Sequence, residues 1–320
     1  MSPKVSIVVP VFNGSKFVER NSGYILEQTY KNFEVIFVVD SRTTDDSISM
    51  IEERLRLYPS ASVVVQEGGG VGEAKNIGID RAKGELVWFL DIDDRPLPHC
   101  LNTLVGVQEE YNADVAILNY IRSSKNDPVI KIKSKDVVRM DRYEALDARG
   151  KNRIPVTSWS MMTRADLIRN NGLRFIPNEY FEDIDFANRL LTKADVICFC
   201  REPLLVYVQN PDSICGAKKN NERGADEIRS YRRLMEYMEK NEPEYAERFR
   251  RNAVSMIMRS STRMDAAHFI GFAKDPDTRA TLKSVRGNLE TGLFRLFPRL
   301  YRAMARIYMK FIFYREGKTF

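Results

Sequence analysis

Short runs of β-branched and aromatic residues alternate with helical patterns through the first 120 residues, and this alternation limits the fold more than any other feature. The runs read as nearly continuous apolar segments, as expected for strands buried on both faces. They are Val5 to Val9, Phe33 to Val39, Ala61 to Gln66, Glu85 to Leu90 and Asp114 to Asn119. Helical patterns lie between them, near 15–29, 45–57, 71–82 and 97–110. The sequence therefore predicts an α/β fold with a central, mostly parallel sheet flanked by helices.

The strict alternation ends near residue 128. Shorter elements follow at 128–133 and 155–163, then a helix near 181–193 and strands near 195–200 and 204–208, and beyond Asn220 the pattern is helical to the end. This change predicts two domains, a sheet-containing domain over 1–218 and a C-terminal helical region over 219–320.

The basic charge of the chain sits at one end. Lys and Arg contribute 50 charges against 44 from Asp and Glu, a net charge of +6. Residues 291–320 alone hold seven of the basic side chains (Arg295, Arg299, Arg302, Arg306, Lys310, Arg315 and Lys318) and one acidic side chain, Glu316, so the first 290 residues are neutral. This distribution argues against a nucleic-acid partner, which needs cations clustered over its binding face.

Five of these basic residues, from Arg295 to Lys310, recur at spacings of 4, 3, 4 and 4 and share one helical face. Opposite them lie Leu293, Leu296, Phe297, Leu300, Met304, Ile307, Tyr308 and Phe311. The pattern predicts a basic amphipathic helix over about 291–313 that lies on an anionic membrane surface. The alternative is a helix whose apolar face packs on its own domain or on a second subunit, so an oligomer stays open.

Cysteine content and hydropathy predict where the chain works. Cys100, Cys198, Cys200 and Cys215 are too few and too unevenly spaced for a disulfide framework. No stretch approaches the ~20 apolar residues of a membrane span, and no signal peptide is evident. We expect a cytoplasmic protein, peripheral on the inner face of the cell membrane.

Three carboxylates, those of Asp91, Asp93 and Asp94, directly follow the fourth apolar run. They lie where open α/β sheets place ligands, at the carboxyl end of a buried strand. Carboxylates so close repel one another unless a cation compensates them. Mg²⁺ or Mn²⁺ carrying a substrate diphosphate fits, because these ions prefer one or two carboxylates plus phosphates. The alternative is a solvated acidic turn before a helix.

With its neighbouring blocks, this acidic motif resembles the family 2 glycosyltransferases, inverting enzymes of the Rossmann-like GT-A fold. The resemblance spans about residues 3–215 and rests on ordered blocks at 5–14, 28–36, 70–79, 91–94, 178–186 and 202–207. It implies transfer of a sugar from a nucleotide-diphosphate donor to an acceptor hydroxyl, with Mn²⁺ or Mg²⁺ as cofactor. The basic tail and family usage favour a lipid-linked or cell-surface glycan as acceptor.

The resemblance assigns roles to the donor side. Asp93 is the expected metal ligand, and Asp91 meets the ribose or the metal shell. The backbone of Pro10, Val11 and Phe12 and the carboxylate of Asp40 line the nucleobase pocket, and Lys75 lies near the base or phosphates. UDP is favoured because a carboxylate can accept the imide N–H of uracil.

The acceptor side centres on the block Glu182-Asp183-Ile184-Asp185. In the family the Asp of a Glu-Asp pair is the general base, so the resemblance assigns this role to Asp183. Inversion needs a carboxylate on the face opposite the leaving group. Glu182 and Asp185 either support it or merely complement the helix dipole. Trp159 either stacks on the acceptor or packs in the core. Lys218 and Lys219 are predicted to fold over the diphosphate as a lid, with a solvated loop as the alternative.

Two departures from the family pattern leave alternatives open. Val39 stands where the family carries a carboxylate, and neither Arg nor His follows Tyr207 at the usual spacing. A catalytically degenerate GT-A protein acting as a membrane scaffold is therefore one alternative. A nucleotidyltransferase is another, but it would need a basic glycine-rich loop near the first strand, which the sequence lacks. Absence of the processive Gln-x-x-Arg-Trp motif favours a single addition per acceptor.

Overall fold

A computed structural model describes residues 2–123, 136–155, 157–208, 221–285 and 289–315, with the backbone alone from 308 onward. The chain divides into two compact units, Met1–Asn210 and Pro211–Gly317. The predicted boundary at 218 falls outside the described residues. We describe each unit separately.

The described part of the first unit holds a nine-stranded sheet, which confirms the predicted α/β class. Its order is β3 (Ala61–Gln66), β2 (Phe33–Asp40), β1 (Val5–Val11), β4 (Leu86–Phe89), β8 (Met161–Arg164), β6 (Val115–Ser123), β9 (Ile197–Val208) and β5 (Arg95–Pro96), and β7 (Val137–Met140) also pairs with β9. Strands β1 to β4 run parallel to one another. The antiparallel β8 separates β4 from the parallel pair β6 and β9.

The strand order brings three strand ends together. Val8, in the middle of β1, pairs with Ile36 of β2 on one side and with Phe89 of β4 on the other. The strands β2 and β3 therefore lie on one side of β1 and the later strand β4 on the other. Because β1, β2 and β4 are parallel, their carboxyl ends meet at one edge of the sheet. Open α/β sheets bind ligands at this kind of switch point.

The helices of the first unit follow the predicted alternation and add two elements. Observed helices are α1 (Ser15–Leu26), α2 (Ser47–Leu55), α3 (Gly70–Arg81), α4 (Cys100–Tyr111), α5 (Arg142–Gly150), α6 (Ala165–Asn170) and α7 (Glu182–Lys193), with a 3₁₀ turn at Ser158–Ser160. The sequence did not predict α5 or α6. A capping box of Asp141 and Glu144 begins α5 and is a readable helix signal.

Two predicted strands, 195–200 and 204–208, are one strand, β9, and the separation was wrong. The exposed Arg201 and the Glu202-Pro203 pair interrupt the apolar run. In the structure a register shift between β6 and β9 absorbs this interruption near Pro203. An irregularity of this kind keeps a strand continuous although its apolar pattern breaks. The short element predicted at 128–133 lies outside the described residues.

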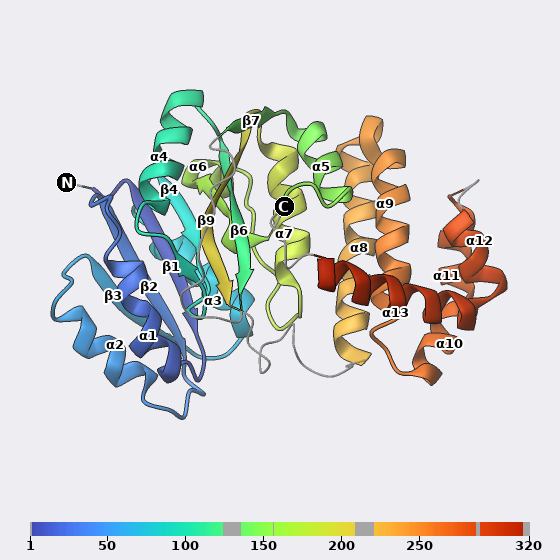
Figure 1. Cartoon of the computed structure of the whole chain (residues 1–320), viewed down its shortest axis with the longest axis horizontal. Coiled ribbons are helices and arrows are strands. Elements are labelled where there is room, and N and C mark those ends of the chain that lie inside the picture. Colours follow the sequence, from blue (N-terminus) through green and yellow to red (C-terminus); the bar gives the residue numbers. More distant parts are fainter. Residues whose placement is uncertain (1, 124–135, 156, 209–220, 286–288, 316–320) are drawn as a thin grey trace. The chain divides into compact units, whose positions relative to one another are not determined.

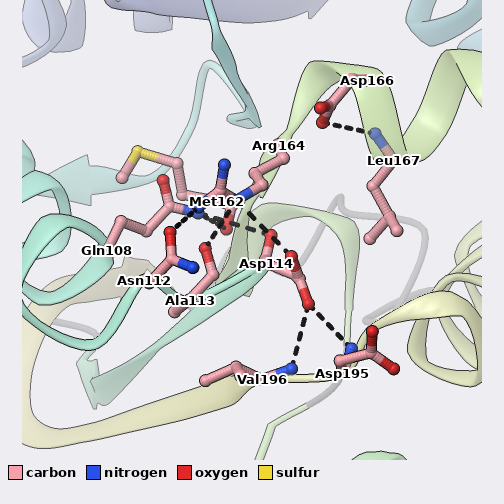
Figure 2. A network of polar contacts seen from close by, with 10 residues as sticks. All are labelled: Gln108, Asn112, Ala113, Asp114, Met162, Arg164, Asp166, Leu167, Asp195 and Val196. Atoms are coloured by element: carbon pink, nitrogen blue, oxygen red, sulfur yellow. Dashed lines mark hydrogen bonds and ion pairs between the residues drawn. The ribbon is translucent and has the colours of Figure 1, made fainter.

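A polar network ties β6, β8 and β9 together at the opposite, amino-terminal edge of the sheet (Figure 2). The Asp114 carboxylate accepts hydrogen bonds from the backbone N–H groups of Asp195, at 2.8 Å, and Val196, at 3.0 Å. Arg164, at the end of β8, lies 3.5 Å from the same carboxylate and donates to the Ala113 carbonyl. A polar cavity of about 520 Å³ opens beside it, lined in part by Lys4, Lys83, Gln108 and Arg169.

The second unit is helical in its described part, as expected for the region after Asn220. Its helices are α8 (Asn221–Asn241), α9 (Pro243–Ser261), α10 (Ala266–Lys274), α11 (Pro276–Lys283), α12 (Leu289–Leu296) and α13 (Pro298–Arg315). A single residue, Glu242, separates α8 from α9, and the two helices pack side by side (Figure 1). Among the described residues, none of the helices has the length and apolar content that a bilayer crossing demands. The tail predicted as one helix is two, because Pro298 starts α13.

Candidate active site

The acidic triad Asp91, Asp93 and Asp94 lies in the turn after β4, at the switch point of the sheet. One carboxylate oxygen from each residue lies within 4.8 Å of those of the other two. The turn is fixed by its own backbone, since Asp94 N–H donates to the Asp91 carbonyl at 3.1 Å. It is also fixed by α1, whose buried Asn21 amide donates to the Ile92 carbonyl at 2.9 Å.

Burial makes this triad costly without a cation. It raises the pKa of Asp93 to about 6, with the Asp91 charge adding to the effect. It also raises the pKa of Asp94 well above its usual range, and the charges of Asp93 and Asp91 act in the same direction. Deprotonation of all three therefore requires a positive charge nearby.

The donor atoms of the triad fit a hard divalent cation. Asp94 is 1% exposed, and one of its oxygens accepts from the Val208 backbone N–H at 3.3 Å. Its other oxygen, Oδ2, is buried without a hydrogen-bond partner among the described residues. An oxygen-only donor set with an unsatisfied buried oxygen suits Mg²⁺ or Mn²⁺. The residues present thus fit the metal that the sequence predicts.

The second acidic cluster begins helix α7. Phe181, which precedes the helix, has φ 60° and ψ 37°, in the left-handed region. Such a conformation is unusual for a bulky side chain and is found where a site demands it. Glu182 and Asp185 are buried, and Asp185 pairs with Arg189 one turn later at 2.5 Å. Asp183, between them, is only half-buried.

Lys75 of α3 joins the two acidic clusters. Its buried Nζ lies 2.7 Å from Glu182 Oε1 and donates to Ser158 Oγ at 2.8 Å. Burial alone would lower the pKa of this ammonium, but the charges of Glu182, Asp91 and Asp183 outweigh burial and raise it. Lys75 is therefore a permanent cation among three carboxylates.

Asp183 has the raised pKa of a base that works near neutral pH. Burial raises its pKa to about 7, and the Glu182 charge acts in the same direction. Lys75 opposes this shift, Asp91 adds to it and Arg149 at the end of α5 opposes it. A base with a pKa near the working pH combines availability with proton affinity.

The predicted nucleobase pocket lies at the ends of β1 and β2. Pro10 and Val11 pair with Val38 and Val39, and Phe12 beyond them is 58% exposed. Asp40 is buried at the end of β2, where Arg42 Nη2 reaches its carboxylate at 2.6 Å and Gln66 donates to it at 3.3 Å. The Arg42 hydrogen bonds hold the pKa of Asp40 down at about 2. Asp40 is thus ionised and already bridged by a guanidinium.

Trp159 belongs to a buried aromatic cluster. The residue is 9% exposed. Its ring stacks on that of Tyr207, with ring centroids 5.6 Å apart, and packs edge-on against that of Tyr120, with centroids 4.9 Å apart. Trp159 thus packs in the core, and its contact with the acceptor stays a prediction.

Four basic residues remain to be compared with the predicted site. Lys218 and Lys219 lie outside the described residues. Arg149 and Arg122 did not emerge from the sequence; Arg122 lies at the end of β6 within 5.8 Å of the Tyr120 and Tyr207 rings. No sequence motif marks Arg149, because folding alone brings its charge near Asp183.

Comparison with known proteins agrees with this geometry. The model of the family described as glycosyl transferase family 2 matches residues 6–171. Glycosyltransferase GlyG of Streptococcus pneumoniae is 30% identical over 222 residues, which cover 67% of this chain and 73% of that protein. Uncharacterized glycosyltransferase YibD of Escherichia coli is 23% identical over 252 residues, covering 77% and 73% of the two chains.

Solved structures share the fold. Residues 1–349 of Staphylococcus aureus TarS, crystallised with UDP-GlcNAc, superpose with a TM-score of 0.64 and 18% identity over 95% of this chain and 87% of that one. A mannosyltransferase of Pyrobaculum calidifontis, solved with GDP-Man and Mn²⁺, gives a TM-score of 0.53 and 18% identity over 96% and 87%. At these identities the likeness supports the GT-A fold alone.

Proposed function

Because the chain belongs to glycosyl transferase family 2 and is a glycosyltransferase using a nucleotide-sugar donor, we propose that it transfers one sugar, with inversion, from a UDP-linked donor to an acceptor hydroxyl. The observation that carries this proposal is the meeting of two acidic clusters across Lys75. One cluster follows β4 and suits a metal-bound diphosphate, and the other begins α7 and offers a base.

On the donor side, Asp93 is the proposed metal ligand, with Asp91 beside it and the unsatisfied Asp94 oxygen behind both. When bound, the divalent ion supplies positive charge that stabilises the diphosphate as a leaving group. The chain's own residues fix where that charge sits, because the 91–94 turn is held by α1 and by β9.

On the acceptor side, Asp183 is the proposed general base. Its carboxylate takes the proton of the acceptor hydroxyl while the hydroxyl oxygen bonds to the anomeric carbon. The bond from that carbon to the diphosphate oxygen breaks on the opposite face, which inverts the configuration and releases the nucleoside diphosphate. The neighbouring Glu182 is held by Lys75 in an ion pair at 2.7 Å, which leaves Asp183 as the carboxylate available to the acceptor.

Asp40 is the proposed uracil contact, with the backbone of Pro10 to Phe12 beside it. In the ligand-free chain Arg42 holds this carboxylate, so Arg42 has to swing away or share it when a base binds. The TarS structure with UDP-GlcNAc supports UDP. The mannosyltransferase structure with GDP-Man and Mn²⁺ supports the metal and makes a guanine nucleotide the main competitor.

The proposed acceptor is a lipid-linked or cell-surface glycan intermediate, met at the cytoplasmic face of the cell membrane. This part of the proposal is supported by the cationic tail, since residues 291–315 contain six basic and no acidic residues. The predicted lid of Lys218 and Lys219 remains part of the proposal as a further source of positive charge over the diphosphate.

The test is turnover of a panel of UDP-, GDP- and dTDP-sugars with and without Mn²⁺. We expect metal-dependent release of nucleoside diphosphate from UDP-sugars, which Asp183→Asn reduces by about 10²–10⁴-fold. Absence of turnover and of nucleotide binding would instead support the degenerate scaffold, the alternative that Val39 and the bridged Asp40 favour.

A further inference from the structure

Helix α13 packs on its own unit through a face that its apolar pattern does not reveal. Tyr301 and Ala305 are buried, and the Tyr301 ring meets Phe294 of α12 at 5.0 Å. Arg302 lies on the same side, with its Nη2 donating to the Met264 carbonyl at 2.5 Å and its guanidinium 5.1 Å from the Phe269 ring. Arg306, one turn later, reaches the Thr262 carbonyl at 3.4 Å.

The opposite side of α13 and the end of α12 form an exposed apolar surface, which we call the tail stripe. Its side chains are Leu296 at 70% exposure, Phe297 at 59%, Leu300 at 51%, Met304 at 51% and Ile307 at 70%. Leu300, Met304 and Ile307 recur at helical spacing and so share one face. Contiguous exposed side chains of this size mark an interaction surface rather than ordinary surface variation.

Positive charge borders the tail stripe without negative charge to balance it. Arg295 and Arg299 are exposed, and in the described part of the chain neither has an ion-pair or hydrogen-bond partner. No Asp or Glu occurs from 291 to 315. Glu290 just before is turned inward, where it accepts from Tyr301 OH at 3.0 Å and from Ser255 at 2.5 Å.

We propose that the tail stripe inserts into the interface of an anionic lipid bilayer, with Arg295 and Arg299 at the level of the phosphates. The inference rests on the proposed membrane location and specifies the contact: α13 lies in the membrane plane, and its inward arginines, Arg302 and Arg306, act as clamps that hold the stripe outward. An apolar face with flanking cations is the composition that binds such interfaces.

A second copy of the chain is the less suitable occupant. Stripe-to-stripe contact would bring the Arg295 and Arg299 groups of two copies near one another with no carboxylate of this segment to compensate them. Like charges at a contact disfavour association, whereas lipid phosphates satisfy both the apolar and the cationic part of the surface.

The test is co-sedimentation of the full chain with vesicles of phosphatidylcholine, alone or mixed with phosphatidylglycerol. Leu300→Glu/Ile307→Glu removes apolar insertion, and Arg295→Glu/Arg299→Glu reverses the bordering charge. The matched controls are Leu57→Glu/Val65→Glu, exposed apolar residues of the first unit at 72% and 52%, and the exposed Arg56→Glu. Point variants are preferable to truncation, because truncation would also remove the packed Phe294 and Tyr301.

Wild type and controls should bind the mixed vesicles and release them as salt rises, and each stripe variant should bind at least about tenfold more weakly. Equal vesicle binding by the wild type and the stripe variants would overturn the inference. So would stripe variants that dissociate a dimer of the chain but bind vesicles as the wild type does. Turnover of a soluble donor, measured in parallel, should be unchanged in the stripe variants. Stripe variants that lose vesicle binding but keep turnover would support the membrane contact independently of the proposed chemistry. Absence of turnover in the wild type would instead contradict the proposed chemistry.

Discussion

At the scale of single residues, the site depends on how one ammonium is shared among buried carboxylates. Lys75 faces Glu182, Asp91 and Asp183, so the cluster carries more negative than positive charge before any metal binds. Of these three, Glu182 makes the direct contact, with its Oε1 2.7 Å from Lys75 Nζ. Asp183 is left half-buried with a pKa of about 7, so it can gain or lose a proton near neutral pH.

The pH dependence of turnover follows from this arrangement. The base must be deprotonated to accept the hydroxyl proton, so kcat/KM should fall about tenfold per pH unit below a pKa near 7 and level off above it. The measurement is a pH profile of donor turnover at saturating Mn²⁺. Asp185→Asn, which alters an acid already paired with Arg189, should keep the same profile. A flat profile from pH 5.5 to 8 in wild type would contradict the assignment.

Sequence reasoning located the acids but not their partners. Asp93 and Asp183 are visible because each belongs to a compact acidic block beside a recognisable strand or helix. The pairing of Lys75 with Glu182, 107 residues apart, and the bridging of Asp40 by Arg42 depend on where side chains point after folding. Arg149 was missed for the same reason, since its charge acts on Asp183 only because α5 packs against α7.

At the scale of elements, the junction of α3 and α7 fixes the site. Lys75→Met should lower the free energy of unfolding by about 3–5 kcal/mol, because it leaves the buried Glu182 and the partly buried Asp91 and Asp183 without their cation. Glu182→Gln should cost clearly less, because it removes one negative charge from a cluster that holds an excess. Urea unfolding with a metal chelator present measures both. If Glu182→Gln lowered the free energy of unfolding more than Lys75→Met, the Lys75–Glu182 ion pair, and not the excess negative charge of the cluster, would determine the stability of this junction.

Close approach of the backbone at Gly72 makes this junction possible. A Cβ at Gly72 would lie 2.6 Å from the Ile176 carbonyl oxygen and 3.5 Å from Glu182 Cγ. Gly72→Ala should therefore displace the segment leading into α7, destabilise the chain by about 1–3 kcal/mol and reduce turnover through a misplaced Asp183. The control is Gly106→Ala on α4, where nothing lies within 4 Å and a gain of about 0.4–1 kcal/mol is expected. Equal effects of the two variants would contradict the packing argument.

Helices and strands with a clear apolar pattern were predictable from the sequence. The orientation of elements that depends on contacts with distant residues was not. The strands β1 to β4 and β6 carry apolar runs, so their existence follows from the sequence, whereas their order in the sheet was not predicted. Helix α13 shows the limit of the same reasoning. The sequence places its five basic residues on one solvent- or lipid-facing side, yet Arg302 and Arg306 lie inward because long arginine stems pack on apolar surface while their heads reach carbonyl oxygens.

At the scale of the whole molecule, chemistry and charge belong to different units. The first unit holds the acidic clusters and the proposed nucleobase pocket, and the second holds the tail stripe and its bordering arginines. The net charge of +6 is therefore a property of the end of the chain. Donor chemistry and membrane attachment should respond to separate sets of substitutions.

The central claim, that the Asp91–Asp94 turn binds a metal-bound donor while Asp183 acts in the transfer step alone, is tested most directly by calorimetric titration of UDP with and without Mn²⁺. Wild type and Asp183→Asn should bind UDP only when Mn²⁺ is present, with affinities within about threefold of each other, and Asp93→Asn should lose this binding. UDP binding that does not depend on Mn²⁺, or that survives in Asp93→Asn and disappears in Asp183→Asn, would contradict the account.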